Sequence, residues 1–332
     1  MDKIKKEIAL SGMRPTGKLH LGHLIGVLEN WIKIQDEYDS FFFVADWHAL
    51  TTEYSNPTMI KDLGREMVLD WLAAGINPEK AIIFLQSDIS EHAELHLILS
   101  MIVPVPWLER VPSYKEMKEE LTNKDLSTYG FLGYPLLQAS DILIYKSNIV
   151  PVGIDQVPHI ELTREVARRF NHIYGKEVFA EPQAKLTETS KLLGLDGRKM
   201  GKSYNNCIYL SDSSEEIRQK VMTMMTDPQR VKRTDCGNPE LSVVFSYHKI
   251  LSPPETVKEI DDKCRNAKIG CIDCKKELLK NLLEYISKFQ ERRSVLSKKW
   301  KDADEILLLG GRKAKEVASE TIREAKEAMR IG

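Results

Sequence analysis

The stretch PTGKLHLGHLIG, residues 15 to 26, places His20 and His23 three positions apart, with glycines at 17 and 22. The pattern of residues 5 to 12, before this stretch, predicts a short strand. Leu21, Leu24 and Leu28 form the apolar stripe of an amphipathic helix that begins within it. Glycines let a backbone approach a ligand closely, and a helix N-terminus attracts phosphate. The unit therefore predicts a phosphate-binding loop between a strand and a helix.

The chain up to about residue 205 alternates between buried strands and helices. Strands are expected at 41–46, 81–87 and 149–153, and helices near 57–74, 92–103, 128–147 and 157–172. This alternation predicts an α/β fold with a doubly wound, Rossmann-like parallel sheet. Such sheets bind ligands at the carboxyl ends of their strands, where the opening loop lies. After about residue 210 strand signals fade and helical periods dominate, so an all-helical C-terminal domain is expected.

The composition is that of a soluble globular protein, with 332 residues, 42% hydrophobic and 29% charged. The longest apolar run, 97–108, is interrupted by two prolines and is too short to span a bilayer. The N-terminus lacks the apolar core of a signal peptide, so we expect a cytoplasmic protein without a membrane partner. The net charge is −1, so any nucleic-acid binding must depend on local basic patches.

A second loop, GRKMGKS at 197–203, carries Lys199 and Lys202 on either side of Gly201. It lacks the spacing of a P-loop, but two lysines suit a leaving pyrophosphate, whose charge grows as its bond breaks. Without a second motif beside it, a lysine-rich loop is usually an exposed loop with no ligand. The histidine pair is an unlikely metal site because no third and fourth ligands lie nearby. Taken together, the two loops favour phosphate chemistry.

The two loops resemble the HIGH and KMSKS signatures of class I aminoacyl-tRNA synthetases. Nearly the whole chain is similar to the bacterial-type tryptophanyl-tRNA synthetase family, in SGMRPTGKLHLGH, ADWHALT, YPLLQASDILIY, PVGIDQVPHIELTREVARRFN, DGRKMGKS and MMTDPQRVKRTD. The sequence departs from the family pattern at Gly201, where serine is usual, and at Ile154, where many relatives have glutamate. Both signature lysines and Asp155–Gln156 remain.

The resemblance implies a two-step reaction. Tryptophan attacks the α-phosphate of MgATP to give an adenylate and pyrophosphate, and the aminoacyl group then passes to tRNA(Trp). The Mg²⁺ is expected on ATP rather than in a protein carboxylate cage. The implied catalytic residues are His20, His23, Lys199 and Lys202. The implied ATP-binding residues are Arg14, Thr16, Gly22, His23, Gly153, Asp155, Lys199, Met200, Lys202 and Ser203.

Three residues of the segment YGFLGYPLLQASDILIYK share one helix face, because Tyr134, Gln138 and Asp141 are spaced i, i+4 and i+7. Asp141 has apolar neighbours, and a buried carboxylate needs a partner. The single N–H donor of an indole would supply one, whereas a phenylalanine ring would leave Asp141 unpaired. Tyrosine also has a donor, and a cap or ion pair within the fold is an alternative. The resemblance assigns the indole to Asp141 and adds Met13, His48 and Gln156 to the tryptophan site.

Four cysteines indicate a soft-metal site, because Cys271 and Cys274 form a C-x-x-C pair with Cys264 and Cys236 upstream. The spacing does not separate zinc from an iron–sulfur cluster, and reduced free thiols are the alternative. A subset of the family carries a 4Fe–4S cluster whose later three cysteines match Cys264, Cys271 and Cys274. The usual first position is Ser242 here, so Cys236 is the expected, though uncertain, fourth ligand.

The resemblance also implies a domain plan and partners. Residues 1–205 would be the catalytic domain, 206–305 a helical anticodon-binding domain with the cysteines, and 306–332 a helix that packs back toward the catalytic domain. Basic residues gather at 164–169, 230–233 and 292–301. The expected partners are ATP, L-tryptophan, tRNA(Trp) and a second copy in a homodimer, with no DNA. Competing hypotheses are a ligase for tyrosine or another acid, a non-catalytic RNA-binding paralogue and an iron–sulfur redox protein.

Overall fold

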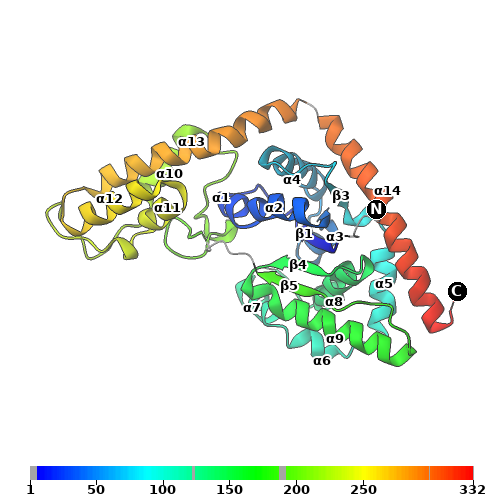
Figure 1. Cartoon of the computed structure of the whole chain (residues 1–332). Coiled ribbons are helices and arrows are strands. Elements are labelled where there is room, and N and C mark those ends of the chain that lie inside the picture. Colours follow the sequence, from blue (N-terminus) through cyan, green and yellow to red (C-terminus); the bar gives the residue numbers. More distant parts are fainter. Residues whose placement is uncertain (1–5, 122–123, 187–191, 299, 332) are drawn as a thin grey trace.

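The computed structural model describes residues 6–121, 124–186, 192–298 and 300–331. Its centre is a parallel sheet with the order β3-β2-β1-β4-β5 (Figure 1). The strands are β1 (Ile8–Met13), β2 (Asp39–Val44), β3 (Ala81–Leu85), β4 (Ile149–Val152) and β5 (Gln183–Leu186). The chain builds outward from β1 in both directions, which confirms the predicted doubly wound α/β fold. The strand order reverses between β1 and β4, where such sheets form a ligand crevice.

Helices cover the sheet on both faces. They are α1 (Leu21–His23), α2 (Glu29–Glu37), α3 (Asp46–Glu53), α4 (Ile60–Ala74), α5 (Glu91–Ser100), α6 (Val105–Glu109), α7 (Pro112–Glu120), α8 (Tyr129–Ile144) and α9 (Val157–Tyr174). Single turns lie at η2 (Gln86–Asp88), η3 (Ile154–Gln156), η4 (Lys202–Tyr204) and η5 (Pro239–Leu241). The helix expected after the opening loop contains a π-helical stretch, η1 (Leu24–Leu28), between α1 and α2. Its apolar stripe is buried as expected.

The structure adds elements that the sequence analysis did not predict. β5 has four residues, Gln183–Leu186, with mixed burial and no apolar run, and it pairs with β4. α3 immediately follows β2 and shows little amphipathic pattern. Both elements depend on packing against neighbours rather than on a local signal, which is why periodicity missed them.

The C-terminal half is helical, as predicted. It contains α10 (Ser214–Thr223), α11 (Val243–Leu251), α12 (Pro254–Arg265), α13 (Cys271–Ser297) and α14 (Trp300–Met329). α13 packs against α10 and α11 at one end and against α4 at the other, so it joins the two lobes (Figure 1). Its buried residues, Leu278, Leu282, Ile286 and Phe289, follow the helical period along one stripe.

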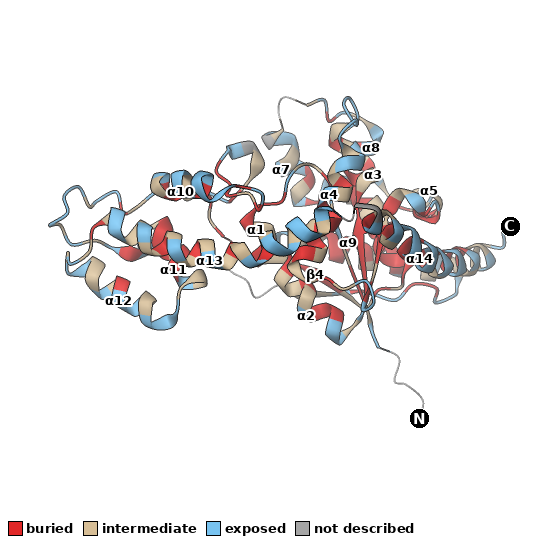
Figure 2. Cartoon of the chain, turned by 90° about the horizontal axis from the view of Figure 1, so that it is seen from above, coloured by how far each residue is buried: buried red, intermediate tan, exposed pale blue. Residues whose placement is uncertain are grey.

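Helix α14 returns to the lobe that contains the sheet and lies against the edge strand β3 and α5 (Figure 1). A Cβ atom added at Gly310 would lie 1.9 Å from the backbone oxygen of Ile83, so glycine allows this close approach. Buried residues concentrate at the sheet and on the inner faces of its helices, while the outer faces of α12 and α14 are exposed (Figure 2). In the described ranges, no helix has both the length and the apolar character needed to cross a membrane.

Candidate active site

A cavity of about 450 Å³ opens at the carboxyl ends of β1 and β4, at the reversal of strand order. One wall comes from the end of β1 and the loop after it, and another from α8. All six residues predicted to bind tryptophan line this cavity, namely Met13, His48, Tyr134, Gln138, Asp141 and Gln156. Five residues predicted to bind ATP also line it, namely Arg14, Thr16, His23, Gly153 and Lys202. The structure thus brings together residues that lie up to 189 positions apart, from Met13 to Lys202.

The two signature loops meet at this cavity. Lys202 Nζ donates a hydrogen bond to the carbonyl oxygen of Gly17 at 2.9 Å. Gly17 has a φ of +133°, a conformation that residues with a side chain rarely adopt. Next to this contact, the Leu21 N–H donates to the Ile208 carbonyl at 2.9 Å. The segment after the second loop is therefore paired with the opening loop.

Burial lowers the pKa of Lys202 to about 8, an effect that the nearby positive charge of Arg14 reinforces and Cys207 opposes. Folding removes water from the ammonium group, and within the described residues no carboxylate pairs with it, so its charged form is destabilised. A phosphate in the cavity would supply the missing negative charge. The ammonium group of Lys202 is thus suited to bind an incoming phosphate, because in the free protein its charge is not neutralised by a protein carboxylate of the described residues.

His20 and His23 stack on each other, with ring centroids 3.7 Å apart. Burial lowers the pKa of His20 to about 4 and the pKa of His23 well below its usual value, so both rings are neutral near pH 7. The backbone N–H of His20 donates to Nδ1 of His23 at 3.2 Å. The proton of a neutral His23 is therefore on Nε2, which makes it a donor. His23 lines the cavity, whereas His20 lies behind it.

Besides His20, four of the predicted residues do not line the cavity, namely Gly22, Asp155, Lys199 and Met200. Gly22 lies against His20, and an added Cβ there would be 3.5 Å from Sδ of the buried Met200. Lys199 and Asp155 are exposed. The side chain of Ser203 is outside the part that the structure describes.

Asn206, which the sequence analysis did not single out, holds the second loop in shape. Its Oδ1 accepts the backbone N–H of Gly201 at 2.9 Å, and its Nδ2 donates to the Lys199 carbonyl at 3.1 Å and to Asp196 Oδ1 at 2.8 Å. The Asn206 side chain is buried, so this arrangement fixes the backbone on which Lys199 and Lys202 stand.

Asp141 is 1% exposed and already has protein partners, which corrects the expectation that it would be unpaired without an indole. His92 Nδ1 lies 2.6 Å from Oδ1, and His48 Nε2 lies 2.9 Å from Oδ2. Gln86 Nε2 donates to both oxygens, at 2.8 and 3.0 Å. Burial raises the pKa of Asp141, but the hydrogen bonds from His48 and His92 outweigh it and hold the pKa at about 2. The site therefore presents a permanent negative charge at the end of an apolar pocket.

A second polar chain also lines the cavity. Ser113 Oγ lies 2.9 Å from the Tyr134 hydroxyl and 2.6 Å from His159 Nε2, and all three residues line the cavity. Neither Ser113 nor His159 was predicted as a site residue. His159 lies in one of the motifs that carry the resemblance, whereas Ser113 had no local signal.

Three of the four predicted metal-ligating cysteines, Cys264, Cys271 and Cys274, line one small pocket together with Ser242. Cys236 is exposed and is not part of this lining. Burial raises the pKa of Cys264, and it raises that of Cys274 to about 12, so these thiols are protonated near pH 7. Within the described ranges, no group of three or more His, Cys, Asp or Glu side chains is arranged to hold a metal ion.

The model of the family described as tRNA synthetases class I (W and Y) matches residues 3–323. The fold, the two signature loops and this match define a class I aminoacyl-tRNA synthetase. The tryptophan–tRNA ligase of Thermotoga maritima is 54% identical over 324 residues, which cover 97% of this chain and 98% of that protein. That of Aquifex aeolicus is 44% identical and covers 97% and 99% of the two chains. The chain therefore belongs to the tryptophanyl-tRNA synthetase family.

Solved structures agree with this membership. The tryptophanyl-tRNA synthetase of Campylobacter jejuni, described as complexed with ADP and tryptophan, superposes with a TM-score of 0.87 at 30% identity. The match covers 98% of this chain and the whole of that one. The corresponding enzyme of Mycoplasma pneumoniae superposes with a TM-score of 0.80 at 28% identity.

Proposed function

We propose that the 450 Å³ cavity is where this chain acts as a tryptophan–tRNA ligase. The ligase activates L-tryptophan with MgATP, releases pyrophosphate and transfers the tryptophanyl group to the 3′ end of tRNA(Trp). The observation that carries the assignment of the site is the contact of Lys202 with Gly17, which brings both signature loops to the mouth of the cavity. No covalent enzyme intermediate is needed, since the carboxylate of tryptophan is itself the nucleophile.

The phosphates of ATP lie along the two loops in this proposal. The Nε2–H of His23 and the ammonium of Lys202 face the same cavity, and both are hydrogen-bond donors. Charge on the leaving pyrophosphate grows in the transition state, so donors held in place there accelerate the step. His20 supports the ring of His23, and Lys199 reaches the phosphates from the exposed side of its loop. Mg²⁺ would arrive with ATP as part of the substrate and would supply positive charge to its phosphates.

Tryptophan lies on the other side of the cavity, with its ring toward α8. The Asp141 carboxylate accepts the indole N–H, and Met13 contributes an apolar contact to the ring. Tyr134 and Gln156 hold the amino group. A phenylalanine ring offers no donor to Asp141, so the desolvated carboxylate would lose a hydrogen bond on its binding.

Exchange of labelled pyrophosphate into ATP, measured with each of the twenty amino acids, tests this proposal. Exchange that depends on tryptophan alone is expected, and the Lys202→Ala variant should lose it by orders of magnitude while it still binds tryptophan. Exchange that depends on another amino acid would contradict the assignment of the pocket. If Lys202→Ala exchanges as fast as the wild type, Lys202 has no part in the step.

We propose a metal centre at the three-cysteine pocket, a 4Fe–4S cluster with zinc as the alternative. The three thiols are soft ligands that suit either group. Within the described ranges they are not arranged around an ion, so binding would displace their protons and turn the side chains toward the metal. The pocket of about 20 Å³ would also have to widen to hold a cluster. Cys264, Cys271 and Cys274 would hold the metal, and it would stabilise the helical lobe.

Metal content per chain after anaerobic purification tests the metal centre. Cys271→Ser should remove the metal, and unchanged content would refute the centre. The fourth ligand is open between Cys236, which is exposed, and Ser242, which lines the pocket. Cys236→Ser and Ser242→Ala are therefore a matched pair, and the variant that loses metal identifies the ligand.

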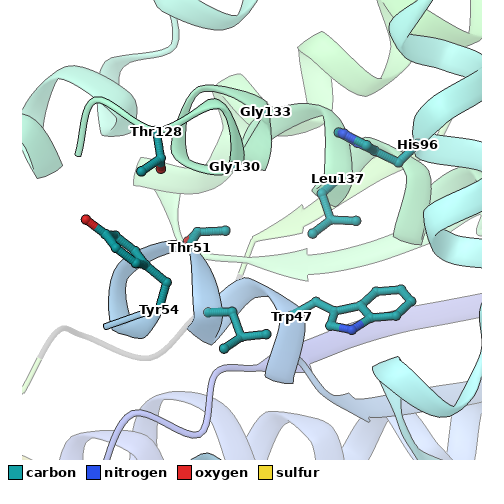
Figure 3. A pocket seen from close by; sticks show the side chains of 9 residues that line it. Trp47, Thr51, Tyr54, His96, Thr128, Gly130, Gly133 and Leu137 are labelled. Atoms are coloured by element: carbon teal, nitrogen blue, oxygen red, sulfur yellow. The ribbon is translucent and has the colours of Figure 1, made fainter. Parts of the chain in front are cut away.

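We also propose that the ligase is a homodimer and that the apolar surface around α3, α5 and α8 forms its interface. A cavity of about 430 Å³ lies there, lined by Trp47, Thr51, Tyr54, His96 and Leu137 among others (Figure 3). Leu97 and Met101, on the α5 side of this surface, are 57% and 70% exposed. Leu97→Glu should give a monomer by light scattering, whereas Leu308→Glu, at 53% exposure on α14, should not.

We propose that the helical region 206–305 binds the anticodon and that the ligase is cytoplasmic, as protein synthesis requires. Several basic residues of the sequence patches do not face outward. Arg169 donates to the Ile102 carbonyl at 2.5 Å, and Arg293 pairs with Asp70 at 2.7 Å. Exposed residues such as Lys232 and Arg233 remain candidates for backbone contacts to tRNA.

A further inference from the structure

A polar shell lies behind Asp141, on the side away from the cavity. It consists of Gln86, His92 and Tyr145, each 0% exposed, and none of them lines the cavity. Gln86 follows the edge strand β3, His92 is in α5, and Tyr145 ends α8. Three elements that are separate in sequence thus converge behind one carboxylate.

The shell occupies most of the hydrogen-bonding capacity of Asp141. A carboxylate offers about four lone-pair sites. His92 and Gln86 approach Oδ1 at 2.6 and 2.8 Å, and His48 and Gln86 approach Oδ2 at 2.9 and 3.0 Å. The Gln86 amide is shared between both oxygens, so three donors leave capacity for about one more. Because Asp141 faces the cavity, that donor is a ligand group.

The proton positions in the shell follow from the charge of Asp141. An ionised carboxylate only accepts, so Nδ1 of His92 donates to it. If His92 is neutral, its Nε2 then accepts, and the Tyr145 hydroxyl, 2.7 Å away, donates to it. In that state Tyr145 selects the tautomer of His92 that serves Asp141.

The shell also contains an unsatisfied group. Gln86 Oε1 is buried, and within the described residues it has no hydrogen-bond partner. Rotating the amide would turn Oε1 toward the carboxylate, where acceptors would face each other, so the orientation is dictated by Asp141. Folded proteins rarely leave such an atom unpaired, and exceptions concentrate where function requires them.

We propose that Gln86, His92 and Tyr145 are positioning residues that keep Asp141 ionised and aimed at the substrate ring, and that they thereby set the preference for a ring with an N–H donor. This inference rests on the proposed role of Asp141 in tryptophan binding. Protonation of Asp141 would place an O–H against the indole N–H, and two donors would then face each other.

The inference predicts a pH signature. The titratable groups that face Asp141 are His48, His92, His96 and Tyr145. Without the His92 donor, one of the contributions that lower the pKa of Asp141 against burial is lost, and the pKa rises. Asp141 is ionised above its pKa, so a raised pKa removes the acceptor on the acid side of the profile. There kcat/KM for tryptophan falls about tenfold for each pH unit below the new pKa.

Pyrophosphate exchange between pH 5 and 8 tests this with three variants. His92→Leu should raise KM for tryptophan roughly tenfold or more at acid pH and leave KM for ATP unchanged. His92→Asn keeps a donor near the position of Nδ1 and should restore most of the tryptophan KM. Tyr145→Phe removes one buried oxygen and should produce a smaller effect in the same direction. Equal changes in both KM values, or no acid shift, would overturn the inference.

Two further measurements distinguish a failure of the proposed role of Asp141 from a failure of this inference. Asp141→Asn is measured in the same assay. If it leaves KM for tryptophan unchanged, the proposed role of Asp141 fails. If it raises that KM while neither His92→Leu nor Tyr145→Phe changes it at any pH, the inference alone fails. Thermal unfolding of each variant identifies misfolding, and if His92→Leu does not fold, Tyr145→Phe decides the question.

Discussion

Replacing Lys202 by arginine should remove the alkaline limit of tryptophan activation. Burial lowers the pKa of Lys202 to about 8. Roughly nine tenths of such a group is protonated at pH 7 and roughly one tenth at pH 9. If the charged form binds the phosphates, kcat/KM for ATP in the wild type falls about tenfold over this range. Arginine stays protonated throughout, so its profile should be flat.

The assay is pyrophosphate exchange at saturating tryptophan between pH 6.5 and 9.5. The amino group of tryptophan also titrates in alkaline solution, and comparing the two proteins under identical conditions separates its effect from that of Lys202. The shape of the profile is compared rather than its height, since arginine is bulkier than lysine. Lys199→Arg is the matched control and should keep the alkaline fall, because Lys199 is exposed and outside the cavity wall.

Two results would refute the reasoning. A wild-type profile that stays flat to pH 9.5 would mean that the cationic form of Lys202 persists or is not needed. If kcat/KM for ATP still falls at alkaline pH in Lys202→Arg as it does in the wild type, a group other than Lys202 is responsible for the fall.

Three further outcomes are expected. Burial raises the pKa of Asp70 to about 6, above its unfolded value, so its ionisation destabilises the fold as pH rises from 4 to 6. By urea unfolding, Asp70→Asn should therefore gain about 3 kcal/mol relative to wild type between pH 4 and pH 7. Gly310→Ala should cost about 3 kcal/mol by overpacking against β3, whereas Gly311→Ala, with 3.9 Å of room, should not. Asn206→Ala should slow activation roughly tenfold with tryptophan affinity unchanged, as measured by pyrophosphate exchange and calorimetry.

Local patterns in the sequence were enough to predict four of the five strands. The cavity residues that were predicted came partly from helical spacing and partly from the resemblance to a known family. The apolar runs at 41–46 and 81–87 correspond to β2 and β3, because a strand whose sheet is covered by helices on both faces has apolar residues at consecutive positions. The spacing of Tyr134, Gln138 and Asp141 put them on one face of α8, because the helical period is a property of the chain itself. The two signature loops were recognisable because each is contiguous.

Tertiary structure alone decided how these pieces act together. The donors to Asp141 lie 49, 55 and 93 positions away in the sequence, and no period relates them to it. The contact of Lys202 with Gly17 spans 185 positions, and the lowered pKa of Lys202 exists only because folding removes its water. Sequence determined which groups are available and which face of a local element they share. Packing determined which of them lose solvent and meet, and hence which charges and proton positions the site presents.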